Sequence, residues 1–231
     1  MDLSDFIYPT SGSEKHEYRL GGEIMPSVTQ IISPLQDFSH VRHDVLERAK
    51  RFGTAVHMAT VLSDQEDLDE DNLDPSLVPC LNAWRKFKSE TGFVSEHIEL
   101  PLYSPIHRFA GTIDRIGSMS HYADQKLRGR RMILDIKTGS TIYPTVGLQT
   151  AAYRILWNER YPTARVVSRC SVRLFTNGTY RLDFFGDRMD VKVFLALLHK
   201  RDLNALIMSW ITKNGLNLTP DGLLETIEMG E

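Results

Sequence analysis

Cysteine is scarce in this sequence. Its two residues, Cys80 and Cys170, lie far apart, with no Cys-x-x-Cys pair and no Cys/His spacing around either of them. Structural zinc sites and cubane iron–sulfur clusters take several such ligands at characteristic spacings, so neither is expected here. Both thiols are instead predicted to be buried.

Long apolar runs are also lacking. None approaches the about 20 residues that a membrane-spanning helix requires, and the first residues do not follow the basic-then-apolar order of a signal peptide. We therefore expect a protein of the cytoplasm, or of the host cytoplasm if it is viral, with no membrane partner. A GxxxxGK[ST] loop is absent as well, which excludes a P-loop ATPase motor.

Neither sign of charge dominates, because the formal net charge of the 231 residues is only -3. Such a balance gives no overall attraction to nucleic acid, so a DNA partner would have to meet a local basic surface. A hydrophobic content of 42% is enough for one substantial core. We expect a single domain over 1–231, with an N-terminal helical part (1–92) and a core (93–231).

Hydrophobic periodicity and turn signals predict a mixed order of elements. Residues 1–23 show no regular pattern. Helices are predicted within 26–35, over 41–62, up to the Thr91-Gly92 pair, over 144–160 and over 190–213. Strands are predicted over 94–104, 108–118, 131–139, 164–175 and 179–186, the last two joined at the hairpin signal Asn177-Gly178.

The stretch ILDIKTGS (133–140) carries the first chemical signal. Because side chains alternate along a strand, Asp135 and Lys137 face the same side. Asp114, in AGTIDRIG, is expected at the end of the preceding strand. Two carboxylates brought together are costly unless one is protonated or a cation lies between them, and oxygen-rich sites suit magnesium.

Two helices add further polar groups. Gln149 and Tyr153 are four residues apart, so they share one face of the helix that follows the Asp135 strand. His57 flanks the apolar stripe of the helix over 41–62, and imidazole is a common metal ligand. Together these residues predict a metal site that is completed by helices on both sides of two strands.

In this order, His57, GTIDRIG, DIKTG, Gln149 and Tyr153 resemble the PD-(D/E)XK nuclease superfamily. The pattern is most similar to its RecB-like branch, including phage-type and mitochondrial-genome-maintenance exonucleases. The resemblance covers about Gly53 to Tyr153. It implies an α/β fold of restriction-endonuclease type: a central mixed sheet with an αβββαβ core, flanked by helices, and an N-terminal helical extension.

Carried over to matching positions, the resemblance implies a centre for Mg²⁺ or Mn²⁺. Its ligands would be His57, Asp114, Asp135 and the backbone carbonyl of Ile136. Lys137 would be the catalytic lysine, acting with Asp114 and Asp135.

Four further residues have supporting roles in this interpretation. Gln149 and Tyr153 would orient the lysine or contact the DNA backbone. The strand glutamate of the family corresponds to Glu96 or Glu99, and the sequence leaves both open. Tyr143 is a candidate for stacking on bases, as aromatic side chains do when proteins bind single strands.

The function expected is metal-dependent hydrolysis of DNA, by an exonuclease acting on single strands or DNA ends in replication, recombination or repair. Proteins of those processes are possible partners, and nothing in the pattern fixes an oligomeric state. Two alternatives stay open. One is a noncatalytic DNA-binding subunit of a recombination complex, and the other is a structure-selective endonuclease, which would also cut circular DNA.

Overall fold

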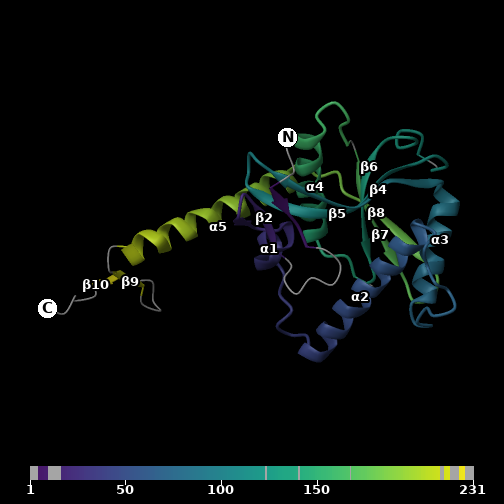
Figure 1. Cartoon of the computed structure of the whole chain (residues 1–231), viewed down its shortest axis with the longest axis horizontal. Helices are drawn as coiled ribbons and strands as arrows, with labels where there is room; N and C mark the ends of the chain where they lie inside the picture. Colours follow the sequence, from purple (N-terminus) through teal and green to yellow (C-terminus); the bar gives the residue numbers. More distant parts are fainter. Residues whose placement is uncertain are drawn as a thin grey trace.

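The computed structural model describes residues 5–9, 17–122, 124–139, 141–166, 168–213, 216–218 and 224–226, with side chains up to residue 204. Its centre is a five-stranded mixed sheet in the order β4-β5-β6-β7-β8 (Figure 1). Only β6 and β7 pair in parallel; the other neighbours are antiparallel. The strands are β4 (Phe93–Ser104), β5 (Phe109–Met119), β6 (Met132–Lys137), β7 (Ser168–Leu174) and β8 (Tyr180–Phe184).

Helices cover the two faces of this sheet. Between β6 and β7 the chain forms α4 (Thr145–Arg160), the crossover that a parallel strand pair requires. α1 (Val28–Ile32) and α5 (Met189–Lys213) pack against α4 in one hydrophobic core cluster. α2 (His43–Asp64) and α3 (Val78–Thr91) form a second cluster with the sheet. The far part of α5 extends away from the body of the molecule (Figure 1).

Sequence signals explain where several elements end. At α1, Ser27 Oγ accepts the backbone N–H of Gln30, and the Gln30 side chain accepts the N–H of Ser27, which is a capping box. α3 ends at Gly92, whose φ of 62° is a left-handed C-cap conformation. Asn177-Gly178 turns between β7 and β8 as predicted.

The prediction for residues 1–23 was wrong, because part of that segment is a small sheet. β1 (Phe6–Ile7), β2 (Tyr18–Leu20) and β3 (Glu23–Met25) pair antiparallel. Strands of two or three residues are too short to show alternation. The signal was in the turn: Gly21 and Gly22 both have positive φ, and two such residues close a tight hairpin.

The remaining elements agree with the sequence-based order of helices, three strands, a helix, a hairpin and a helix. The α/β class with a mixed sheet is thus confirmed. Two very short strands, β9 (Leu216–Leu218) and β10 (Leu224–Thr226), pair with each other beyond α5. Among the described residues, no helix has the length and apolar character to cross a membrane.

Candidate active site

The site lies where β5 and β6 separate. These strands pair only from Arg115 to Gly117 on β5, while β5 continues beside β4 along its whole length. Asp114 therefore lies in the middle of its strand. The sequence-based prediction that Asp114 ends this strand was wrong. Its Oδ2 accepts the backbone N–H of Ile136 at 2.7 Å, which satisfies a donor that the ladder no longer pairs.

Three potential metal ligands converge at this point. His57 of α2, Glu99 of β4 and Asp114 of β5 each present one ligand atom, and these atoms lie within 4.8 Å of one another. His57 Nδ1 is 3.7 Å from Asp114 Oδ2 and 3.9 Å from Glu99 Oε1. One imidazole nitrogen with two carboxylates is a donor set that fits Mn²⁺, and its oxygens suit Mg²⁺.

The orientation of His57 follows from a backbone contact. Its Nε2 lies 2.9 Å from the carbonyl oxygen of Ile136, which can only accept, so Nε2 carries the proton. Nδ1 then presents its lone pair to the carboxylates of Glu99 and Asp114. Ligand histidines commonly donate their second N–H to such a carbonyl, which fixes the tautomer.

The charges around His57 govern its pKa. Burial by itself lowers the pKa of the imidazole, but the negative charges of Asp114 and Glu99 outweigh it and raise the pKa above the ordinary value. The surroundings of Nδ1 therefore favour a positive charge. A divalent cation would meet the same negative field.

Glu99 has an unusual backbone. Its φ is 46°, in the left-handed region that costs a residue with a side chain about 1–2 kcal/mol. The register passes from Ile98 to Leu100 with no pairing at Glu99. Strain of this kind concentrates at functional sites. Here it accompanies a carboxylate that is placed beside His57 and Asp114.

A chain of polar contacts leads away from β6. Lys137 Nζ lies 3.0 Å and 2.9 Å from the two carboxylate oxygens of Asp135, and it donates to Gln149 Oε1 at 3.2 Å. Gln149 Nε2 in turn donates to the Tyr153 hydroxyl at 2.9 Å. The same-face prediction for Asp135 and Lys137 is borne out by their contact, and α4 supplies the other two groups.

Burial and neighbouring charges shift the pKa values of the two charged groups in this series of contacts. Asp135 is fully buried, and burial together with the charge of Asp114 raises its pKa to about 6, although Lys137 acts in the opposite direction. Burial lowers the pKa of Lys137, but the charges of Asp135 and Asp114 more than compensate, so the net shift is upward. The lysine is therefore held as a cation beside the carboxylates.

Behind the ligand group lies a buried arginine that the sequence reading missed. Arg115 is fully buried and donates to Asp64 at 2.9 Å, to Thr60 at 3.1 Å and to the carbonyl of Asp114 at 2.7 Å. It also reaches Glu99 Oε1 at 3.4 Å. Arg115 thus holds both the main chain of one ligand candidate and the side chain of another.

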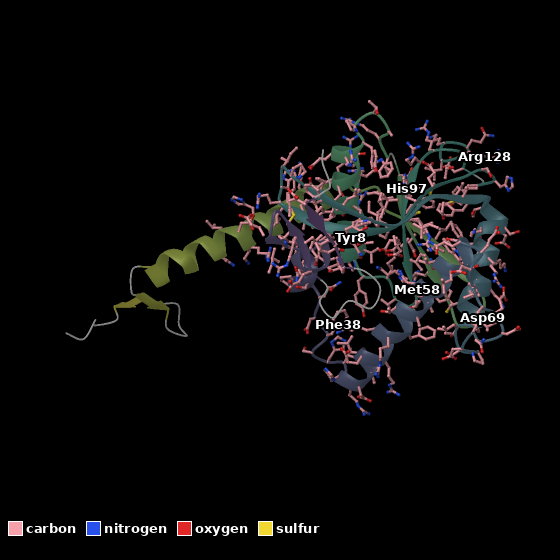
Figure 2. All side chains as sticks on the ribbon, viewed as in Figure 1. Tyr8, Phe38, Met58, Asp69, His97 and Arg128 are labelled. Atoms are coloured by element: carbon pink, nitrogen blue, oxygen red, sulfur yellow. The ribbon has the colours of Figure 1, made fainter. Side chains whose placement is uncertain are left out.

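Asp64 is the first residue of the acidic run 64–75. The run 64–75 looks like a solvated acidic loop, and Asp69 indeed lies at the outer edge of the molecule (Figure 2). Asp64, however, ends α2 with a side chain that is only 2% exposed. Besides Arg115, it accepts hydrogen bonds from Trp84 and Lys88.

Three other candidates lie outside the ligand group. Glu96 is exposed and forms an ion pair with Arg131, so of the two strand glutamates only Glu99 contacts the site. Tyr143 is 46% exposed and meets Phe38 edge-on at 5.7 Å. Asp135 does not belong to the group of His57, Glu99 and Asp114. Its carboxylate contacts Lys137 instead.

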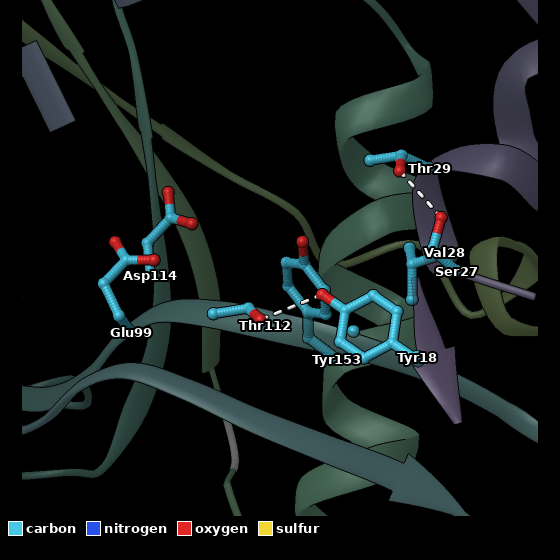
Figure 3. A pocket seen from close by; sticks show the side chains of 9 residues that line it. Tyr18, Ser27, Val28, Thr29, Glu99, Thr112, Asp114 and Tyr153 are labelled. Atoms are coloured by element: carbon cyan, nitrogen blue, oxygen red, sulfur yellow. Dashed lines mark hydrogen bonds between the residues drawn. The ribbon is translucent and has the colours of Figure 1, made fainter. Parts of the chain in front are cut away.

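A pocket of about 180 Å³ opens beside the two carboxylates (Figure 3). Glu99 and Asp114 lie at one side of it, the Tyr18–Thr112 pair and Tyr153 stand in its middle, and the start of α1 forms the opposite side. β2 and the residues before α1 were not expected at the site. Its lining residues are Tyr18, Ser27, Val28, Thr29, Glu99, Gly111, Thr112, Asp114 and Tyr153.

Known proteins resemble this chain only distantly. No family model and no curated protein matches the chain. The crystal structure of a candidate exonuclease from Eubacterium rectale is 11% identical, with a TM-score of 0.45 over 78% of this chain and 72% of that one. The structure of SSO0001 is 13% identical, with a TM-score of 0.34 over 76% and 83%. Likenesses as distant as these carry no conclusion about the function of this chain.

Proposed function

We propose that this protein is a Mg²⁺- or Mn²⁺-dependent deoxyribonuclease of the PD-(D/E)XK type, with a restriction-endonuclease-like core in one domain over 1–231. It resembles RecB-like exonucleases in its motif order. One observation carries the proposal: where β5 and β6 separate, the group of His57, Glu99 and Asp114 meets a charged Asp135–Lys137 pair.

The cation would be held by His57 Nδ1, Glu99 and Asp114. A bound divalent cation supplies Lewis-acid activation of a phosphate and a water of lowered pKa. Asp135 and the carbonyl of Ile136 remain proposed ligands by resemblance. In support of the Asp114 role, its Oδ2 accepts the N–H of Ile136, which orients the carboxylate.

Lys137 is the proposed catalytic lysine. Its ammonium is kept positive by Asp135 and oriented by Gln149, so it can stabilise negative charge that develops on a phosphate oxygen. Gln149 is itself held by Tyr153. Tyr143, an exposed aromatic side chain, is proposed to stack on an unpaired base of the DNA.

The substrate we propose is single-stranded DNA or a free DNA end, processed in the cytoplasm during replication, recombination or repair. The support is the motif order that the chain shares with exonucleases. Proteins of those processes are the partners that this role would require.

The decisive experiment compares wild type, Lys137→Ala and the control Lys192→Ala. Lys192 is an exposed lysine of α5. Each protein is incubated with end-labelled linear single-stranded, linear duplex and circular DNA, with Mg²⁺, Mn²⁺ or EDTA. We expect wild type and the control to degrade linear DNA only with a metal, and Lys137→Ala to lose cleavage while retaining fold and DNA binding.

Other results of this experiment would indicate one of the two alternative functions. Cleavage of circular DNA would indicate a structure-selective endonuclease. DNA binding without cleavage by wild type in either metal would indicate a noncatalytic subunit. Undiminished cleavage by Lys137→Ala would refute the role of the lysine. As a separate readout, Mn²⁺ should raise the melting temperature of wild type more than that of Asp114→Asn.

A further inference from the structure

We propose that the pocket beside Glu99 and Asp114 receives the sugar or the base of a single unpaired nucleoside, the terminal one of the strand being cut. The inference rests on the proposed nuclease function and adds to it the part of the substrate that this wall of the site recognises. The N-terminal segment contributes Tyr18, Ser27 and Thr29 to the pocket. In this proposal, that segment helps to recognise a DNA end.

The size of the pocket limits its occupant. Its volume of about 180 Å³ is below the about 300–1,000 Å³ of pockets that enclose drug-sized ligands. One sugar or one base can enter, whereas a base pair cannot. A nucleotide entering from the carboxylate side would leave its phosphate next to the proposed metal ligands (Figure 3).

The chemistry of the walls selects a neutral, polar occupant. Beyond the carboxylates, the lining offers hydroxyl groups of Tyr18, Thr112 and Tyr153, and those of Ser27 and Thr29 near α1. No lysine or arginine is among the lining residues. A second phosphate inside the pocket would have no positive partner, while hydroxyls both donate to and accept from a sugar or base.

Tyr153 provides an independent indication of a ligand. Its side chain belongs to a residue only 4% exposed, and its oxygen accepts from Gln149. Within the described part of the chain, no group accepts the Tyr153 hydroxyl proton. A buried donor without an acceptor is costly, so a ligand oxygen or nitrogen in the pocket would complete its hydrogen bonding.

Contacts tie together the wall that β2, β5 and the start of α1 form. The Tyr18 hydroxyl lies 2.9 Å from Thr112 Oγ1, and Tyr18 is only 2% exposed. Ser27 forms an isolated bridge with Ala110 of β5, which ties the start of α1 to the sheet. An occupant would therefore not have to order this wall, which reduces the cost of binding.

The test is calorimetric titration of deoxyadenosine in EDTA, so that nucleoside binding is measured without metal or cleavage. Thr29→Trp places a large ring at the pocket from an exposed position, and Thr112→Val removes one hydroxyl. Thr176→Val, in the exposed β7–β8 hairpin, is the control. We expect the control to bind like wild type, Thr29→Trp to bind at least about tenfold more weakly, and Thr112→Val about three- to tenfold more weakly.

A second assay separates this inference from the nuclease function. With Mn²⁺, Thr29→Trp should release mononucleotides from linear single strands at least about tenfold more slowly. Its rate on bis(p-nitrophenyl) phosphate, a small diester with no nucleoside, should fall by a much smaller factor. Absence of deoxyadenosine binding by wild type, or equal binding by Thr29→Trp, would overturn the pocket assignment even if DNA is cleaved. Failure of wild type to cleave any diester would instead overturn the nuclease function.

Discussion

The ionisation of Asp135 should destabilise the metal-free protein near neutral pH. Burial is the main reason that its pKa in the folded state is about 6, against an ordinary value of 3.8. Because the folded-state pKa is the higher one, folding is favoured by the protonated form. This contribution is fully present below pH 3.8 and is lost as the pH rises through 6.

The size of the effect follows from the shift. A difference of about two pKa units corresponds to about 3 kcal/mol, of which about 2–3 kcal/mol falls between about pH 4 and about pH 7.5. Asp135→Asn removes this titration. The attraction of Lys137 for the ionised carboxylate already lowers the pKa of Asp135 within the value of about 6, so it needs no separate allowance.

The assay is urea unfolding of wild type and Asp135→Asn in EDTA at both pH values. The unfolding free energy of the variant minus that of wild type should be about 2–3 kcal/mol larger at the higher pH. The control Asp202→Asn, at an exposed position of α5, should show no such change. A difference for Asp135→Asn that stays constant with pH within about 0.5 kcal/mol would refute the reasoning.

Two further substitutions test the framework of the site. Arg115→Met should lower the unfolding free energy by about 3 kcal/mol in urea, because it leaves the buried carboxylate of Asp64 with fewer partners; a loss below about 1 kcal/mol would contradict this. Gly117→Ala should cost about 1–3 kcal/mol in the same assay, since its Cβ would meet the backbone oxygen of Val94. Unchanged stability would show that β4 and β5 can move apart.

The order of elements was readable from local chemistry. Ser27 with Gln30, the Thr91-Gly92 end of α3 and the Asn177-Gly178 turn each act over a few residues, so the sequence specifies them directly. The N-terminal sheet was missed because its strands are two or three residues long. Only the adjacent glycines at 21 and 22 marked its hairpin.

The site was readable only in part. Strand alternation is a local rule, so it placed Asp135 and Lys137 on one face. Which of Glu96 and Glu99 contacts the site depended on the backbone of β4. Glu99 has a left-handed conformation there, and no spacing rule predicts it. Arg115 could have been suspected as the lone basic residue of β5, whose other residues apart from Asp114 are apolar or small.

By itself, the sequence determined the class of fold, the order of the strands and helices after the N-terminal sheet, and the set of polar residues on which the proposed nuclease site rests. Tertiary structure decided which of them meet. The end of β5–β6 pairing, the approach of α2 with His57, and the packing of β2 and α1 against β5 all depend on contacts between distant segments. Such contacts are set by the packing of whole elements, which local propensity does not encode.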